Sequence, residues 1–161
     1  MKERLSSSLV LYFFPTFPRL FGRCRGGAFA VVGVGGNIGD VTMVFRKLAL
    51  MLAANRRVGL VATSPILKNP PFGYPDQPDF FNAILFLCTK LSPRELLHFL
   101  LRTERRFGRR RSFPNAPRTL DLDIIFFEDR RVQSDDLIIP HRYWMERESV
   151  IIPLRYMGEV R

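Results

Sequence analysis

The segment Leu120–Phe127, LDLDIIFF, alternates apolar and acidic residues and then becomes entirely apolar. Because successive side chains of a β-strand point to opposite faces, Asp121 and Asp123 are expected on one face and the leucines on the other. Such a strand is typical of an antiparallel sheet that is covered on only one side. The segment therefore predicts a sheet with one buried face and one face that carries two carboxylates.

Five regular elements are expected upstream of this strand. They are a strand at 28–34, a helix from Asp40 to about residue 55, a strand at 58–67, a strand at 80–88 and a helix at 92–107. Asp40 can cap the first helix, and Ser92-Pro93-Arg94-Glu95 has the form of a capping box for the second. The order predicts an α+β fold: a ferredoxin-like βαββαβ sandwich with a four-stranded antiparallel core sheet and helices packed on it.

The first 27 residues differ in character from the rest of the chain. Residues 28–161 are predicted to form one domain, and residues 1–27 an N-terminal extension of unknown role. Lys2 and Arg4 precede a short apolar run at 9–14, but this run is shorter than that of a secretory signal and lacks a small-residue cleavage site. An arm packed on the surface is the favoured interpretation, and an amphipathic contact with a membrane is the alternative.

The composition is that of an ordinary globular domain. Hydrophobic residues make up 47% of the 161 residues and charged residues 25%, and a chain of this length can fold without a metal or a disulfide. No apolar stretch is long enough to span a membrane. The two cysteines, Cys24 and Cys88, are too few for a secreted disulfide framework, which indicates a reducing compartment and a cytoplasmic location. Cys88 is expected in the apolar core.

The formal net charge is +10, and all but four of the 25 basic residues are arginines. Arginine binds phosphates and carboxylates bidentately, so an anionic partner such as a nucleotide, a nucleic acid or an acidic lipid is indicated. Genomic composition is an equal explanation for the arginines outside one cluster. That cluster is the segment 102–118, which holds seven arginines and a single acid, Glu104.

The arginine cluster directly precedes the two aspartates, and this combination favours a nucleotide-phosphate site. Carboxylates on a rigid strand are suitable ligands for Mg²⁺, and nearby arginines can stabilise phosphate oxygens as charge develops. Two alternatives remain open. Asp121 and Asp123 can lie on a solvated face and pair with surface arginines, and the basic segment can bind RNA.

An aromatic, proline-rich loop at 69–79 leads into the strand that begins at Phe80. Phe72 and Phe80 can sandwich a flat heterocycle while Asn82 bonds its edge, and packing of both rings in the core is the alternative. The glycines of 33–40 follow a strand and open a helix, but they lack the ending of a Walker loop and are interpreted mainly as turn formers. His141 is either a phosphate contact or a histidine near the surface.

Several of these segments together resemble the 6-hydroxymethyl-7,8-dihydropterin pyrophosphokinases, enzymes of folate biosynthesis. The resemblance covers residues 28 to about 159. The segments that carry it are Gly35-Gly36-Asn37, Pro70-Pro71-Phe72-Gly73, 76–82, Glu104 with 108–111, 117–124, Ile139-Pro140-His141 and Glu146-Arg147.

The resemblance implies a reaction and a role for each matching residue. The substrates are ATP and 6-hydroxymethyl-7,8-dihydropterin, AMP is released, and the enzyme is expected to be a monomer that needs neither nucleic acid nor a membrane. Arg109 and Arg118 are implied to be catalytic, and Asp121 and Asp123 to hold two Mg²⁺ ions. Residues implied for ATP binding are Glu104, Arg111, His141 and Arg147. Residues implied for pterin binding are Asn69, Pro70, Phe72, Phe80 and Asn82.

Three features depart from the family pattern. Ser149 stands where a second aromatic side chain usually stacks on the pterin, and Asn115-Ala116 stands where many members have Trp-Gly. Residues 1–27 have no counterpart in the core pattern. A catalytically weak relative that binds RNA or another polyanion through 102–118 is the alternative function.

Overall fold

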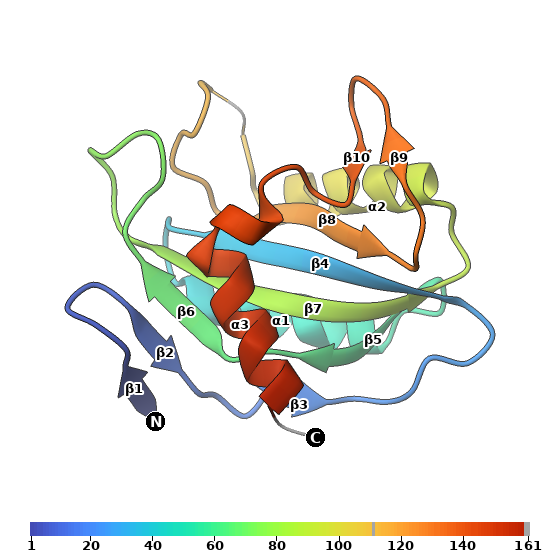
Figure 1. Ribbon diagram of the computed structural model, residues 1–161, viewed down its shortest axis with the longest axis horizontal. Coiled ribbons are helices and arrows are strands. Elements are labelled where there is room, and N and C mark those ends of the chain that lie inside the picture. The colour runs from blue at the N-terminus through green and yellow to red at the C-terminus, as the bar shows by residue number, and fades with distance from the viewer. Residues whose placement is uncertain (111, 160–161) are drawn as a thin grey trace.

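An antiparallel sheet with helices on both faces makes up the structure (Figure 1), a computed structural model that describes residues 1–110 and 112–159. The strands of the sheet are β1 (Lys2–Arg4), β2 (Val10–Tyr12), β3 (Arg19–Leu20), β4 (Ala28–Gly36), β5 (Val58–Thr63), β6 (Ile66–Asn69), β7 (Phe80–Thr89) and β8 (Asp121–Phe127). The helices are α1 (Val41–Ala53), α2 (Pro93–Arg106) and α3 (Glu148–Glu159), with a 3₁₀ turn, η1 (Trp144–Glu146), before α3. A separate hairpin pairs β9 (Val132–Gln133) with β10 (Ile138–Ile139). The expected mix of helices and antiparallel strands is confirmed, but in the described residues the sheet has eight strands where four were predicted.

The predicted strands lie side by side at the centre of the sheet. β4 pairs with β7 from Ala28↔Thr89 to Gly36↔Phe81, and β8 pairs with the other edge of β4. The segment predicted as one strand at 58–67 is two strands, β5 and β6, which pair with opposite ends of β7. Pro65 lies between them, and a proline has no N–H group to continue a ladder.

Helices cover both faces of the sheet (Figure 1). α1 and α2 bury Phe45 and Leu96 against one face. On the other face Val150 of α3 packs in a small cluster with Ile84 of β7. The sequence does not predict α3, because Pro153 lies inside it and an internal proline usually ends a helix. None of the described helices is long and apolar enough to cross a membrane.

Both predicted helix caps are present. Asp40 Oδ1 accepts a hydrogen bond from the Met43 N–H (3.1 Å). Ser92 and Glu95 form the reciprocal capping box: Ser92 Oγ accepts from the Glu95 N–H (3.2 Å), and Glu95 Oε2 accepts from the Ser92 N–H (2.7 Å). These bonds satisfy N–H groups that the first helical turn leaves without partners, so both helix starts are recognisable in the sequence.

Residues 1–27 contribute to the same sheet and to its core. β2 pairs with β6 and β3 pairs with β5, so the extension widens the sheet beyond its predicted edge. Phe17 is 1% exposed and packs on Phe45 of α1, with ring centres 5.9 Å apart. The strands of the extension contain only two or three residues each, which is too few to show an alternating pattern in the sequence.

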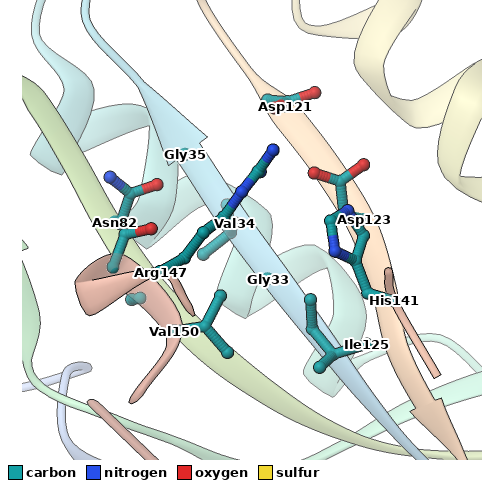
Figure 2. A pocket seen from close by; sticks show the side chains of 12 residues that line it. Gly33, Val34, Gly35, Asn82, Asp121, Asp123, Ile125, His141, Arg147 and Val150 are labelled. Atoms are coloured by element: carbon teal, nitrogen blue, oxygen red, sulfur yellow. The ribbon is translucent and has the colours of Figure 1, made fainter. Parts of the chain in front are cut away.

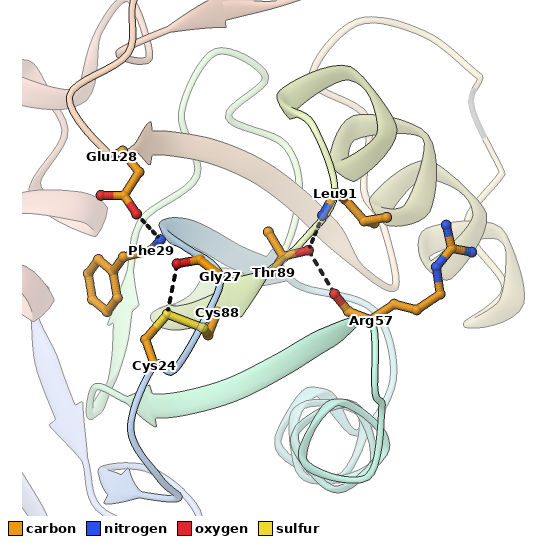
Figure 3. Close-up of a disulfide and its surroundings, with 8 residues drawn as sticks. All are labelled: Cys24, Gly27, Phe29, Arg57, Cys88, Thr89, Leu91 and Glu128. Atoms are coloured by element: carbon orange, nitrogen blue, oxygen red, sulfur yellow. Dashed lines mark hydrogen bonds between the residues drawn. A yellow bond between two sulfur atoms is a disulfide. The ribbon is translucent and has the colours of Figure 1, made fainter.

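A disulfide joins the end of the extension to β7 (Figure 3). Cys24 and Cys88 are 64 residues apart in the sequence and are bonded to each other in the structure. Gly27 permits this approach, since a Cβ there would lie 3.1 Å from Cys88 Sγ and 3.0 Å from the Thr89 carbonyl oxygen. The expectation that Cys88 is an apolar core residue is wrong, because it is half-buried and bonded. The bond also differs from the reduced thiols typical of a reducing compartment.

Reduction of the Cys24–Cys88 bond is expected to lower the free energy of unfolding by about 2–4 kcal/mol, because the bond restricts a long loop of the unfolded chain. Urea denaturation with and without a reductant measures the difference. A Cys24→Ser variant should have the stability of the reduced protein and should not respond to the reductant. Equal stabilities of the oxidised and reduced proteins would contradict the expectation.

Candidate active site

A pocket opens on the sheet face that carries Asp121 and Asp123, between β4, β7, β8 and the start of α3 (Figure 2). Its floor is β4, where Gly33 lies opposite Asp123 and Gly35 lies opposite Asp121 in the strand register. A Cβ at Gly35 would lie only 2.6 Å from Asn82 Oδ1. The absence of side chains at these two glycines therefore creates the space above β4.

The interpretation of the glycines in 33–40 as turn formers is wrong for Gly33, Gly35 and Gly36, which lie in β4. Gly39 does occupy the turn before α1, with a φ of 72°. The two-residue spacing of Gly33 and Gly35 is the sequence signal that could have identified the floor of the pocket. Two glycines two positions apart in a strand share one face, and a glycine inside a strand often marks a close approach.

Asp121 and Asp123 lie on one face of β8, as predicted (Figure 2). Asp121 Oδ1 accepts a hydrogen bond from Arg109 Nη1 (2.5 Å), and its Oδ2 lies 3.5 Å from Arg118 Nη1. Burial and the neighbouring charge of Asp121 raise the pKa of Asp123 to about 7. The charge on Asp123 is thus poorly compensated by the protein, and a bound cation would compensate it. This is not the behaviour of a solvated carboxylate.

The two aspartates fit a hard divalent cation. In the part of the chain that the structure describes, no three His, Cys, Asp or Glu side chains gather into a metal cage. Mg²⁺ commonly binds through one or two carboxylates and completes its shell with water and substrate phosphates. The donor set therefore suits Mg²⁺ shared with a phosphate substrate.

Arg109 bridges Asp121 to a second carboxylate, Glu104 of α2. Glu104 is 3% exposed, and its Oε1 lies 2.9 Å from Arg109 Nη1 and accepts a hydrogen bond from the Leu122 N–H (2.8 Å). Burial opposes the charge on Arg109, but Asp121 and Glu104 raise its pKa above the ordinary value. Glu104 therefore connects α2, β8 and a charged arginine.

Arg147 and His141 also line the pocket. Figure 2 shows Arg147 reaching across β4 toward Asp121, and His141 on the same side as Asp123. Burial and the charge of Arg147 lower the pKa of His141, so its ring is mostly neutral near neutral pH. The Nε atoms of Arg147 and Arg118 are buried and have no hydrogen-bond partner among the described residues. Buried donors of this kind can bind an anionic ligand.

The structure brings together two of the residues expected to bind a heterocycle. Asn82 lines the pocket, and its Nδ2 donates a hydrogen bond to Asn69 Oδ1 (2.7 Å). Asn69 Nδ2 in turn donates to the Pro70 carbonyl oxygen (2.9 Å). Asn82 therefore presents a polar group to the pocket, and Asn69 at the end of β6 supports it without lining the pocket itself.

The two phenylalanines of the predicted sandwich lie beside different arginines. Phe80 is 7% exposed, and Arg118 Cζ lies 5.1 Å from its ring centre. Phe72 is 72% exposed, and Arg147 Cζ lies 5.4 Å from its ring centre. Packing in the core is therefore wrong for Phe72.

Asn37 is a positioning residue whose role the sequence analysis missed. It is buried, its Nδ2 donates to Gln77 Oε1 (2.9 Å) and to the Pro78 carbonyl oxygen (3.0 Å), and its Oδ1 accepts from the Arg118 N–H (2.9 Å). Gln77 Nε2 also donates to the Asn115 carbonyl oxygen (3.0 Å). These bonds connect the aromatic loop to the arginine-rich loop; the motif Gly35-Gly36-Asn37 was the signal that pointed to this residue, but not to its partners.

Two further expectations concern single residues. Arg111, expected to bind ATP, lies outside the described residues. Ser149 lines the pocket, and no phenylalanine, tyrosine or tryptophan is among the described residues that line it. The second aromatic surface is therefore absent from the wall that Ser149 forms.

Comparison with known proteins identifies the family. The 7,8-dihydro-6-hydroxymethylpterin-pyrophosphokinase model matches residues 31–159. The chain is 42% identical over 141 residues to the 2-amino-4-hydroxy-6-hydroxymethyldihydropteridine pyrophosphokinase of Helicobacter pylori, covering 86% of each chain. It is 41% identical over 125 residues to the protein of the same name from Campylobacter jejuni, covering 78% of this chain and 80% of that one. The chain therefore belongs to the 7,8-dihydro-6-hydroxymethylpterin-pyrophosphokinase family.

Proposed function

We propose that this pyrophosphokinase of folate biosynthesis transfers the pyrophosphoryl group of ATP to the hydroxymethyl oxygen of 6-hydroxymethyl-7,8-dihydropterin and releases AMP. The hydroxymethyl oxygen loses its proton and bonds to the β-phosphorus, and the oxygen that bridges the α- and β-phosphorus atoms leaves with AMP. One observation carries the proposal: a carboxylate pair shares its pocket with Arg147, whose buried Nε has no hydrogen-bond partner in the described residues. Family membership supports the same reaction.

Asp121 and Asp123 would hold the two Mg²⁺ ions that we propose accompany ATP. When bound, the metal neutralises phosphate oxygens and orients them for transfer. The raised pKa of Asp123 supports this role, because its negative charge is poorly compensated by the protein and a bound cation would stabilise it.

Arginines supply the fixed positive charge of the proposed site. Arg109 and Arg118 lie against Asp121, where they would stabilise the charge that develops on the transferring group. Glu104 and Asp121 hold Arg109 from two directions, so its guanidinium is oriented before substrate arrives. The ATP phosphates and nucleoside would be bound by Glu104, Arg111, His141 and Arg147.

The Asn69–Asn82 pair at the end of β6 and the start of β7 would receive the pterin. Asn82 would hydrogen-bond the edge of the ring system, since an amide both donates and accepts. Asn69 and Pro70 would support it. Phe80 and Phe72 do not line the pocket but lie beside Arg118 and Arg147, and they would supply flat apolar surface for the heterocycle.

The alternative of RNA binding through 102–118 has no support in the described residues. Arg109 and Arg118 are engaged with acidic side chains of the pocket, and two aspartates beside them would repel a nucleic acid backbone. We propose instead a monomeric enzyme that acts in the cytoplasm, where ATP is available and where the Cys24–Cys88 pair would be held reduced. Its core is ferredoxin-like, with β5, β7, β4 and β8 adjacent in that order.

The test is AMP release from ATP and Mg²⁺ with and without 6-hydroxymethyl-7,8-dihydropterin, with the pterin product weighed by mass spectrometry. We expect AMP release that depends on the pterin and a product heavier by one pyrophosphoryl group. Asp121→Ala is the negative control. A folded, Mg²⁺-loaded protein that releases no AMP and makes no heavier pterin product would overturn the proposal. Tighter RNA binding by Asp121→Ala than by the parent would then favour the alternative function.

A further inference from the structure

We infer that β2 of the N-terminal extension, and Tyr12 in particular, positions the pterin side of the site. The inference rests on the proposed function, because it assigns pterin binding to Asn69 and Asn82. It concerns a segment that precedes the region matched by the family model, which begins at residue 31.

β6, which ends at Asn69, is held along both of its edges. β7 pairs with one edge and places Asn69 opposite Phe80. β2 pairs with the other edge and places Leu11 opposite Leu67. Without β2, this four-residue strand would be the edge of the sheet, where a short strand is weakly held. The location of Asn69 therefore depends on the extension.

Tyr12 also reaches across β6 to β7. Its ring centre lies 5.9 Å from that of Phe81, and Lys68 Nζ lies 5.9 Å from the same ring. Phe81 stands between Phe80 and Asn82 in β7, so it projects from one face of the strand and its two neighbours project from the other. The packing of Phe81 thus sets the backbone from which Phe80 and Asn82 extend toward the site.

The Asn82 side chain has little freedom to adjust. Its Nδ2 donates to Asn69 Oδ1 (2.7 Å), and its Oδ1 lies so close to β4 that a Cβ at Gly35 would be only 2.6 Å away. A displacement of β6 relative to β7 would lengthen the bond to Asn69 and turn the amide. Small errors in the orientation of a binding group have large effects on its contribution.

Other residues of the extension hold it to the domain independently of Tyr12. Phe13 packs on Tyr156 of α3, with ring centres 5.6 Å apart, and Phe17 is buried in the core. The disulfide between Cys24 and Cys88 holds the extension at the far end of β7. Tyr12 can therefore be changed without releasing the extension from the sheet.

Steady-state kinetics of Tyr12→Ala test the inference. We expect the KM for the pterin to rise about tenfold, while kcat and the KM for ATP change by less than about twofold. Tyr12→Phe, which keeps the ring, should retain the parent values. Cys24→Ser is the matched control in the same extension: it should lower the urea midpoint and leave the pterin KM unchanged. A substitution that only lowers stability would not raise the KM for the pterin while leaving the KM for ATP unchanged.

The outcomes distinguish this inference from the proposed function. A parent protein without pterin-dependent AMP release would overturn the proposed function and the inference with it. An active parent whose pterin KM is unchanged in Tyr12→Ala, or rises together with the KM for ATP, would overturn the inference alone. An equal rise of the pterin KM in Cys24→Ser would do the same. If Tyr12→Ala does not fold, Tyr12→Leu replaces it, because leucine keeps a buried apolar side chain without the ring.

Discussion

Asp123→Asn is expected to lower the rate of AMP release by about 10²–10³-fold and to raise the melting temperature of the metal-free protein near pH 8. The rate falls because the proposed metal site loses one of its two carboxylates. The melting temperature rises because the pKa of Asp123 is raised from 3.8 to about 7 by folding. Native Asp123 therefore binds its proton more tightly than unfolded Asp123, and stability is lost as the pH rises between these values. A neutral amide avoids this loss.

The pH dependence of unfolding separates this electrostatic effect from packing. At a pH below about 3, Asp123 is mostly protonated in both states, so Asp123→Asn and the parent should melt at similar temperatures. Asp121→Asn is the matched variant, since Asp121 pairs with Arg109 and Arg118. Its amide should lower the melting temperature near pH 8. Thermal melts followed by circular dichroism in the presence of a metal chelator measure the melting temperatures of both variants. Equal melting temperatures of Asp123→Asn and the parent near pH 8 would contradict the raised pKa of Asp123.

Arg109→Ala is expected to lower the free energy of unfolding by about 3–5 kcal/mol and the rate of AMP release by about 10²–10³-fold. The stability falls because the guanidinium that compensates Glu104 and Asp121 is removed, and Glu104 is almost completely buried. The rate falls because the same guanidinium is proposed to stabilise the transferring group. Urea denaturation and the AMP assay measure the two effects separately.

Arg110→Ala is the control for Arg109→Ala, because Arg110 is the next residue and is exposed. Its stability should stay within about 0.5 kcal/mol of the parent. Arg109→Lys should be intermediate, since an ammonium keeps the positive charge near Glu104 and Asp121, which both contact Nη1 of Arg109, but lacks the delocalised guanidinium. Equal stabilities of Arg109→Ala and Arg110→Ala would show that the bridge to Glu104 and Asp121 contributes nothing.

Local sequence alone was sufficient for most of the central elements and for the shared face of the two aspartates. Both helix starts were predictable because capping residues act on N–H groups within three or four positions. The shared face of Asp121 and Asp123 was predictable because the two-residue period of a strand is a property of its backbone. The order of the central strands and helices was predicted from these local signals, taken one after another along the chain.

The tertiary structure decided the features that depend on residues far apart in the chain. The bond between Cys24 and Cys88, the pairing of β2 with β6 and the contacts of Asn37 each join segments that no local pattern relates. Gly33 and Gly35 became the floor of a pocket only because β7 and β8 flank β4. The physical reason is range: hydrogen-bonded turns and alternating side chains are set by neighbours in sequence, whereas packing, cavities and pKa shifts are set by neighbours in space.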